Sequence, residues 1–174
     1  MAIVVFLRGA NVGGHRRFRP ALVAKKLARF DTINVGATGP FVVREPGSVQ
    51  KFRAALLRHL PFDTHVAICE GRDLLALEKS APFDDETTDV VRFVSVLAAP
   101  ARKRLPKMPF GIPSDDDWYV KILGRKNMFV FGVYRRHMRT ISYLGKIDTA
   151  LGVPVTTRNW NTITAVSKIL RVSD

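Results

Sequence analysis

An apolar run of six residues, AIVVFL at positions 2–7, most constrains what this chain can fold into. The run does not alternate between apolar and polar side chains, which is typical of a strand buried on both faces. Gly9 ends the run, and Pro20 suits the first position of a helix. Apolar residues then recur at helical spacing through residues 23–30. The start of the chain therefore predicts a buried strand followed by a covering helix.

The first 70 residues continue with a regular alternation of element types. Two short β-rich runs, TINVG at 32–36 and FVVRE at 41–45, flank glycine and proline and predict a hairpin. An amphipathic pattern at 48–60 predicts a helix capped by its first residue, a serine. The run THVAIC at 64–69 predicts another strand. Residues 1–70 thus have the order β-α-β-β-α-β, which is that of a ferredoxin-like unit.

The second half, residues 71–174, repeats this order less regularly. We expect a connecting helix, a second ferredoxin-like half and a C-terminal helix, all within one compact unit. The predicted fold class is therefore α+β, with two ferredoxin-like (βαββαβ) halves packed together plus a C-terminal helix. The expected elements are helices at 72–80, 141–152 and 159–172, strands at 90–98, 118–123, 127–134 and 153–157, a helical turn at 99–105, and a connection at 124–126.

The composition favours a globular chain inside the cell. Hydrophobic residues make up 47% of the 174 residues, which is enough to bury a sizeable core. No apolar run approaches the roughly 20 residues that span a bilayer, and the N-terminus lacks the pattern of a signal peptide. Cys69 is the single cysteine, so an internal disulfide is excluded. We expect a cytoplasmic protein with no membrane segment and no cofactor.

The charge is strongly positive and unevenly distributed. The formal net charge is +13, and residues 1–60 carry 11 Lys and Arg against 2 Asp and Glu. Residues 61–120 carry 7 against 11, and residues 121–174 carry 10 against 2. Two basic ends that flank an acidic middle predict a polarised surface if the ends meet in space, and such a field attracts polyanions. The alternative is that the basic charge serves only solubility.

The segment LRGANVGGHRRFRP at residues 7–20 is the first candidate site. Its glycines do not have the G-x-G-x-x-G spacing of a dinucleotide fingerprint. Gly9 and Gly14 have the separation of a Walker loop, but His15 and Arg16 replace the lysine and hydroxyl that this chemistry needs. The glycines still allow backbone N–H groups to point at an anion among several arginines. The alternative is a tight turn from strand to helix, with Asn11 bonding its own backbone.

The segment TTRNWNT at 156–162 is the second candidate site. Thr156 or Thr157 is expected to cap the last helix, and a helix N-terminus beside arginine and asparagines can hold a phosphate. The alternative is architectural, with Trp160 anchoring the helix and the asparagines satisfying the loop. In paired βαββαβ halves both segments can lie at the same end of the sheet, and the sequence leaves open whether they form one site. The predicted anion-binding residues are Arg8, Gly9, Asn11, Gly13, Gly14, Arg16, Arg17, Arg158, Asn159 and Asn161.

Both segments, together with APF at 81–83, resemble the bacterial domain-of-unknown-function family 1697. The family pattern is close to L-R-G-I-N-V-G-G at the start, where Ala10 here replaces the usual isoleucine, and T-R-N-W-N-T near the end. The resemblance covers nearly the whole chain. It implies an α+β fold of two ferredoxin-like halves and no established activity. The turn at 37–40 departs from the family's Q-S-G-N-like turn, so no role is carried over to those positions.

Other kinds of site are poorly supported. The aromatic octamer of RNA-binding sheets is missing, since the run around Phe129 and Phe131 lacks its other residues. The two phenylalanines lie in a run typical of core. The histidines have no ligand spacing, and the acidic runs at 84–89 and 114–118 are typical of solvated loops, so no metal is expected. Cys69 lies in an apolar run where a thiol is usually inert.

Three functions remain open at the level of the sequence. The first is a protein that binds an anionic partner, nucleic acid or a phosphate-bearing ligand, through its basic surface and the Gly9–Gly14 loop. The second is an enzyme acting on a small phosphorylated or nucleotide-like ligand in a cleft between the halves. The third is a structural or assembly role. The sequence identifies no catalytic residue, and it gives neither the partner nor the oligomeric state.

Overall fold

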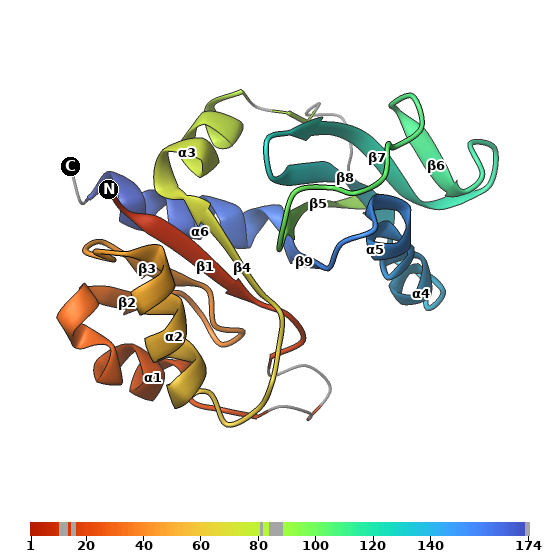
Figure 1. The fold of residues 1–174 in the computed structure, drawn as a ribbon. Coiled ribbons are helices and arrows are strands. Elements are labelled where there is room, and N and C mark those ends of the chain that lie inside the picture. The colour runs from red at the N-terminus through yellow and green to blue at the C-terminus, as the bar shows by residue number, and fades with distance from the viewer. Residues whose placement is uncertain (11–13, 15–16, 81, 84–88, 173–174) are drawn as a thin grey trace.

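The computed structural model describes residues 1–10, 14, 17–80, 82, 83 and 89–172 of the chain. These residues form a mixed α+β fold built around two antiparallel sheets (Figure 1). None of the helices in this part of the chain is long and apolar enough to cross a membrane.

Sheet 1 has the strand order β2-β3-β1-β4 and is formed by the first 70 residues. As the sequence predicts, β1 is buried along its whole length. The helices between strands cover one face of the sheet, and their apolar stripes pack on Ile3, Val5 and Leu7. The elements are β1 (Ile3–Leu7), α1 (Pro20–Lys26), the short 3-10 helix η1 (Ala28–Phe30), β2 (Thr32–Asn34), β3 (Phe41–Val43), α2 (Val49–His59) and β4 (Val66–Glu70).

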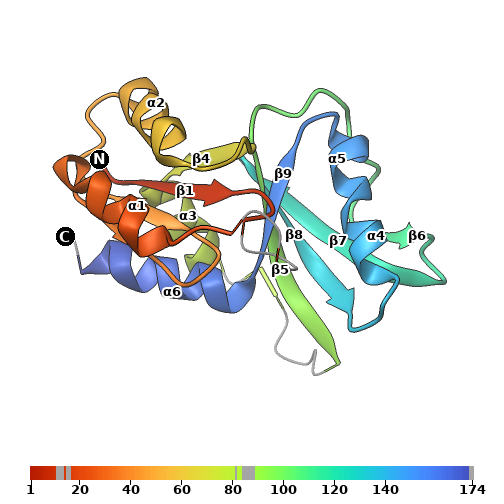
Figure 2. The same cartoon turned by 90° about the horizontal axis from the view of Figure 1, so that it is seen from below.

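Sheet 2 has the strand order β6-β7-β8-β5-β9 and is formed by the second half. One face is covered by α4 and α5, as Figure 2 shows. The elements are α3 (Gly71–Lys79), β5 (Val90–Leu97), β6 (Phe110–Pro113), β7 (Trp118–Lys126), β8 (Phe129–Arg135), α4 (Thr140–Leu144), α5 (Lys146–Leu151), β9 (Val155–Asn159) and α6 (Trp160–Arg171).

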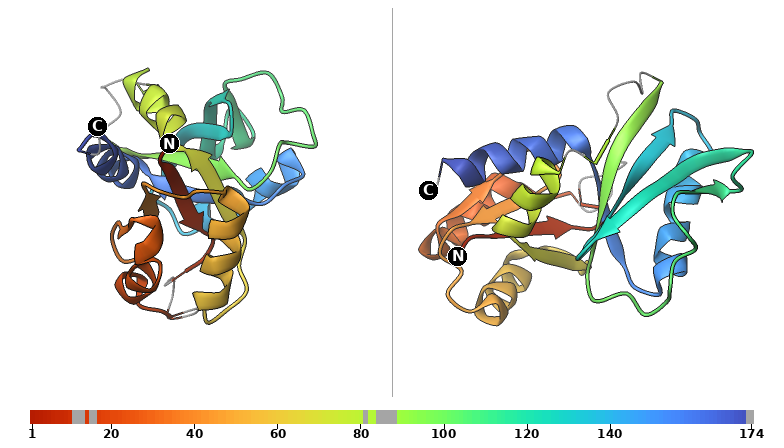
Figure 3. Two further views of the ribbon diagram at one scale, coloured as in Figure 1. Left: turned by 60° about the vertical axis from the view of Figure 1, so that its left-hand side comes forward. Right: turned by 90° about the horizontal axis from the view of Figure 1, so that it is seen from above.

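The central core lies between the two sheets. Val4 and Phe6 of β1 point away from α1 and α2 and pack with Val94 and Val96 of β5. The last helix, α6, leaves sheet 2 and lies against sheet 1 and α3, as Figure 3 shows. Its buried residues continue this core, so the C-terminal helix fastens one sheet to the other.

The expectation of two ferredoxin-like halves is not confirmed. The first half has the predicted order β-α-β-β-α-β, but in the second half β5, β6, β7 and β8 follow one another without an intervening helix. The helical turn expected at 99–105 is irregular chain. The segment from 98 to 109 contains three prolines, and proline lacks the N–H that a helix interior requires.

Three further boundaries differ from the sequence prediction. The expected connection at 124–126 lies inside β7, and the turn is made by Asn127, whose φ is 51°. Asparagine tolerates this left-handed conformation better than most residues. Phe110–Pro113, which was not predicted as a strand, pairs with β7 as an edge strand. The helix expected at 141–152 is divided into α4 and α5 at Gly145.

Gly132 allows β8 to lie close to β7, and it provides a test of this packing. A Cβ atom at Gly132 would lie 2.1 Å from the backbone oxygen of Lys121. We expect Gly132→Ala to lower the free energy of unfolding by about 2 kcal/mol, because backbone must move to admit the methyl group. Urea denaturation followed by circular dichroism measures this change.

Gly145→Ala is the matched control for this substitution. Gly145 has a φ of −62°, and the nearest atom to an added Cβ would be 3.5 Å away. We expect this variant to be neutral or stabilised by up to about 1 kcal/mol, because alanine restricts the unfolded chain without strain. Equal destabilisation of both variants would contradict the assigned register of β7 and β8.

Candidate functional site

The junction between β9 and α6 is formed by the TTRNWNT segment. β9 pairs with β5 as far as Asn159, which lies opposite Phe93. Asn159 is the N-cap of α6, and its side-chain oxygen accepts hydrogen bonds of 2.9 Å from the backbone N–H and the hydroxyl of Thr162. The prediction that Thr156 or Thr157 caps this helix is wrong.

Both threonines lie within the strand that the sequence predicts at 153–157, and β9 continues two residues beyond that prediction, to Asn159. Thr156 is buried, and the Thr157 hydroxyl shares a 2.7 Å hydrogen bond with Ser95 on β5. A hydroxyl satisfied across a sheet has less to offer a helix terminus. The cap is provided instead by Asn159, the last residue of β9 that pairs with β5.

A pocket opens where β9 ends and β5 continues with β8 as its paired neighbour. Residues 90–92 of β5 extend past the last pair with β9, so the edge of β5 is open at this point. The pocket has a volume of about 420 Å³. We call it the arginine pocket, and its lining residues are Val90, Val91, Arg92, Tyr134, Arg136, Asn159, Trp160 and Asn161.

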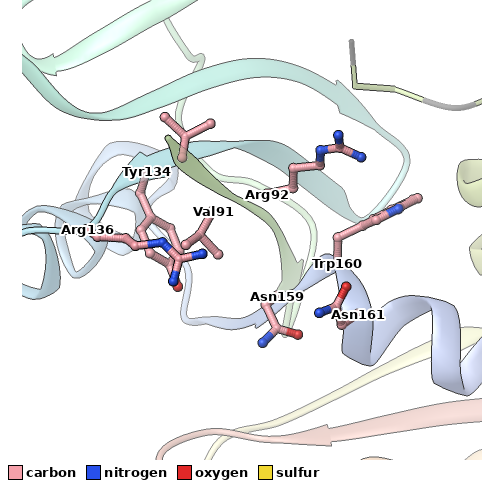
Figure 4. A pocket seen from close by; sticks show the side chains of 8 residues that line it. Val91, Arg92, Tyr134, Arg136, Asn159, Trp160 and Asn161 are labelled. Atoms are coloured by element: carbon pink, nitrogen blue, oxygen red, sulfur yellow. The ribbon is translucent and has the colours of Figure 1, made fainter. Parts of the chain in front are cut away.

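The polar side chains reach the arginine pocket from both faces of the sheet. Figure 4 shows Arg92 and Trp160 on one side of the end of β5 and Tyr134 and Arg136 on the other. The side chains of the two asparagines lie at the start of α6. The arrangement suits a ligand that passes over the open edge of β5 and meets a guanidinium group on each side.

The described residues that line the arginine pocket include two positively charged side chains and no carboxylate. Within the described chain, neither Arg92 nor Arg136 takes part in an ion pair. Burial raises the pKa of Tyr134, and the nearby charge of Arg136 partly offsets this rise. Tyr134 therefore stays neutral at physiological pH and can both donate and accept a hydrogen bond.

The aromatic wall of the arginine pocket is held by packing. The Trp160 ring makes an edge contact with Phe83, with centroids 4.9 Å apart, and Phe83 also contacts Phe131. Trp160 and Phe131 both pack against the central core. The Arg92 guanidinium carbon lies 5.9 Å from the centroid of the Phe83 ring. The architectural interpretation of Trp160 thus agrees with the structure, while its neighbours remain available to a ligand.

Arg158 lies beside the arginine pocket but faces the other sheet. Its guanidinium donates hydrogen bonds to the carbonyl oxygens of Leu7 at 2.7 Å, Thr157 at 2.8 Å and Thr38 at 3.4 Å. Its buried Nε has no acceptor among the described residues. Burial lowers the pKa of Arg158 to about 10, so the group is still charged at neutral pH. Arg158 is thus engaged with the protein backbone.

The contact from Arg158 to Leu7 brings the two candidate segments together. Leu7 is the first residue of the glycine segment, and 151 positions separate it from Arg158. The next residue, Arg8, forms an ion pair with Asp148, and its carbonyl oxygen accepts a 2.6 Å hydrogen bond from the Thr64 hydroxyl. The base of the glycine segment is therefore fixed by the protein itself.

The rest of the glycine segment is only partly described. Gly9 and Gly14 are exposed and have positive φ angles of 64° and 77°, as a loop of this type requires. Arg17 is exposed and, together with Gly14, lines a shallow cavity of about 700 Å³. Asn11, Gly13 and Arg16 lie outside the described residues, so their part in a site stays a prediction.

The sequence therefore identified some of the residues that line the arginine pocket and missed others. Asn159 and Asn161 were predicted, whereas Arg92, Tyr134 and Arg136 were not. These three come from a stretch of β5 and the end of β8 that pair only in the folded sheet, with Val91 opposite Tyr134. A predicted register for these two strands was the one signal that could have found them.

The described residues offer little for catalysis. They contain no group of three or more His, Cys, Asp or Glu side chains that could hold a metal ion. The first acidic run, apart from Asp89, lies outside the described residues. Cys69 is buried in β4, and burial, with Asp73 and Glu70 adding to it, raises the pKa of its thiol. A thiol held protonated in this way is a poor nucleophile.

The hydrogen bonds of Arg158 predict a stabilising role that can be measured. We expect Arg158→Met to lower the free energy of unfolding by about 2 kcal/mol or more, because buried carbonyl oxygens lose charged donors. Arg104→Met is the control, since Arg104 is exposed. The control should change stability by less than about 0.5 kcal/mol. If thermal or urea unfolding gives Arg158→Met and Arg104→Met the same stability, the Arg158 contacts are not maintained in solution.

Comparisons with known proteins give a family and a fold. The family described as "Protein of unknown function (DUF1697)" matches residues 1–120, which is more than half of the chain. A solved structure described as a conserved bacterial protein, SP0830 from Streptococcus pneumoniae, is similar with a TM-score of 0.59 at 14% identity, covering 97% of this chain and 98% of that one. No curated protein matches the sequence. The chain belongs to the DUF1697 family.

Proposed function

We propose that the protein binds a phosphate-bearing ligand in the arginine pocket. The observation that carries the proposal is the combination of two guanidinium groups, two asparagines and a helix N-terminus in one pocket whose described lining residues include no carboxylate. Unpaired arginines that share an open pocket create a positive potential, which is lowered when an anion binds. Carboxylates are the usual way to satisfy such groups within a protein, and the described lining of this pocket contains none.

The chemistry of the arginine pocket favours phosphate over other anions. A guanidinium group presents a planar fork of donors that matches two phosphate oxygens. The first turn of α6, a helix of 12 residues, adds backbone N–H groups and the positive end of the helix dipole. Asn159 uses its oxygen for the cap, so it can offer a ligand only its amide N–H group.

The position of Arg92 and Arg136 indicates the form of the ligand. Because these arginines lie on either side of the end of β5, a single small anion cannot be expected to meet both. A ligand with two linked phosphoryl groups can contact both guanidinium groups. Pyrophosphate should therefore bind more tightly than inorganic phosphate, which supplies one group only.

The glycine segment has a secondary part in this proposal. Arg8 and Arg158, which the sequence nominated for anion binding, are both engaged with the protein. Gly14 and Arg17 border a separate cavity and can extend a basic surface without forming the primary site. Binding is also better supported than catalysis, because Tyr134 is the titratable group of the pocket with a shifted pKa, and the shift leaves it neutral.

A finer assignment of the fold accompanies this function. We infer that residues 1–70 form a ferredoxin-like unit, supported by the strand order β2-β3-β1-β4 with α1 and α2 as crossovers. Residues 90–159 then form an antiparallel sheet whose helices follow the fourth strand. The open edge of β5 is a consequence of this second arrangement.

Isothermal titration with pyrophosphate at low salt tests the proposed function. We expect the double variant Arg92→Gln, Arg136→Gln to lose binding at least tenfold, because each guanidinium supplies charged hydrogen bonds to a phosphoryl group. Arg139→Gln, which removes one charge against the two of the double variant, is the control, since Arg139 is exposed and does not line the pocket.

Two results would contradict the proposal. One is that the unmodified protein shows no heat of binding with pyrophosphate. The other is that Arg139→Gln weakens binding as much per charge as the pocket substitutions, which would indicate a general effect of net charge. Unchanged thermal stability of the variants without ligand ensures that a loss of binding reports the pocket.

A further inference from the structure

One face of sheet 2 carries a row of basic side chains next to the arginine pocket. In antiparallel pairs, residues directly opposite each other point to the same face. Arg92 lies opposite Val133, and Val133 lies opposite Lys121. Arg135 is two residues from Val133 and therefore points to this face as well. Strands β5, β8 and β7 thus each contribute one cation.

A tryptophan lies at the far end of this row. The register between β6 and β7 shifts at Ile112 and Pro113, where β7 has an extra residue. The Trp118 ring contacts two of these cations. The Arg135 guanidinium lies 4.2 Å and the Lys121 ammonium 5.6 Å from its centroid. We call Arg92, Trp118, Lys121 and Arg135 the sheet track.

The sheet track is continuous with the arginine pocket and is left uncovered by α4 and α5. Arg92 belongs to both, and Arg135 lies directly opposite Val90 of the pocket. The two helices lie on the other face of sheet 2, and the central core takes only the part of this face around Val94 and Val96 (Figure 2). With strands about 4.8 Å apart, the track spans about 10 Å from β5 to β7.

We propose that the sheet track binds single-stranded nucleic acid whose backbone continues into the arginine pocket. This inference rests on the proposed function and names its ligand class. Alternating cations and an aromatic ring on an open sheet face match a chain of phosphates with bases that stack. A duplex keeps its bases stacked on each other and cannot use the ring, and an acidic peptide has no bases to stack on it.

Trp118 supplies a stacking platform that the sequence alone does not indicate. Phe129, one of the two aromatics considered for this purpose, is fully buried, and Phe131 packs against the core. Trp118 is only partly buried, and its cation neighbour Arg135 is exposed. When a base takes the place of Arg135 against the indole ring, the guanidinium becomes available to the adjoining phosphate.

An acidic turn limits the track beyond Trp118. Asp115 accepts a 2.6 Å hydrogen bond from the backbone N–H of Gly111, which holds its carboxylate in the turn. Asp116 and Asp117 are exposed and have no ion-pair partner within the described chain. These two carboxylates repel phosphates, so the bound strand ends or turns away there. Removing their charge should strengthen binding.

Fluorescence anisotropy with a labelled oligothymidylate of about a dozen nucleotides tests the inference. We expect Trp118→Leu to weaken binding about tenfold and the double variant Lys121→Gln, Arg135→Gln to weaken it at least as much. The double variant should also lower the slope of log affinity against log salt by about 1.4, because two phosphate contacts are lost. Asp116→Asn with Asp117→Asn should raise the affinity, and Arg139→Gln should leave it nearly unchanged.

Tryptophan fluorescence gives a direct signal of stacking. The chain has two tryptophans, and Trp160→Phe leaves Trp118 as the single emitter while retaining an aromatic contact with Phe83. Quenching on addition of the oligonucleotide supports stacking on Trp118. A duplex of the same length that binds equally well without quenching overturns the inference in favour of simple charge attraction.

The outcomes separate this inference from the proposed function. If pyrophosphate binds in the arginine pocket but the oligonucleotide does not bind, or binds unaffected by the Lys121 and Arg135 substitutions, the track is refuted and the pocket stands. If neither probe binds, both fail. If the oligonucleotide loses affinity in the track variants while pyrophosphate does not, both are supported.

Discussion

The hydrogen bonds from Arg158 to the backbone of Leu7 and Thr38 join the two sheets at the point where the chain must also turn. Arg158 is the penultimate residue of β9, so its guanidinium fixes the end of that strand against sheet 1. Asn159, the next residue, ends the pairing with β5 and caps α6. Because β9 stops here, no strand of the described chain pairs with this edge of residues 90–92 of β5, and the arginine pocket lies at that edge.

The sequence predicted the first half well because its signals are local. The apolar run at 2–7, the serine cap at residue 48 and the paired β-rich runs at 32–36 and 41–45 each specify one element without reference to the rest of the chain. Ser48 does cap α2 by accepting a hydrogen bond from the Lys51 N–H group. In the second half, three prolines between 98 and 109 oppose a helix, and only the pairing of Phe110–Pro113 with β7 gives that segment its structure. Such pairing depends on distant residues, which periodicity does not report.

The candidate site was predicted in part for the same reason. Asn159 and Asn161 belong to a contiguous motif at a helix start, so sequence alone identified them. Arg92 and Arg136 are separated in sequence, and only the register of β5 and β8 brings both of them to the same pocket. Arg158 belongs to the same motif but points to the other sheet. The reason is that β9 extends two residues further than expected, so Arg158 lies inside the strand, where successive side chains point in opposite directions. A motif thus located the region, while strand register decided which of its residues face the pocket.

The distribution of carboxylates explains why the positive charge of this chain is concentrated rather than spread. Among the described residues, Asp148 pairs with Arg8, Glu78 with Arg171, Glu70 with Arg72 and Asp31 with Arg44. These acids neutralise arginines away from the arginine pocket and the sheet track. Exposed Asp116 and Asp117 oppose the field at the far end of the track, and exposed Asp89 opposes it where β5 begins. In a chain with a net charge of +13, this placement of carboxylates leaves Arg92 and Arg136 without an acidic partner in the described chain, which is the arrangement that the proposed anion binding requires.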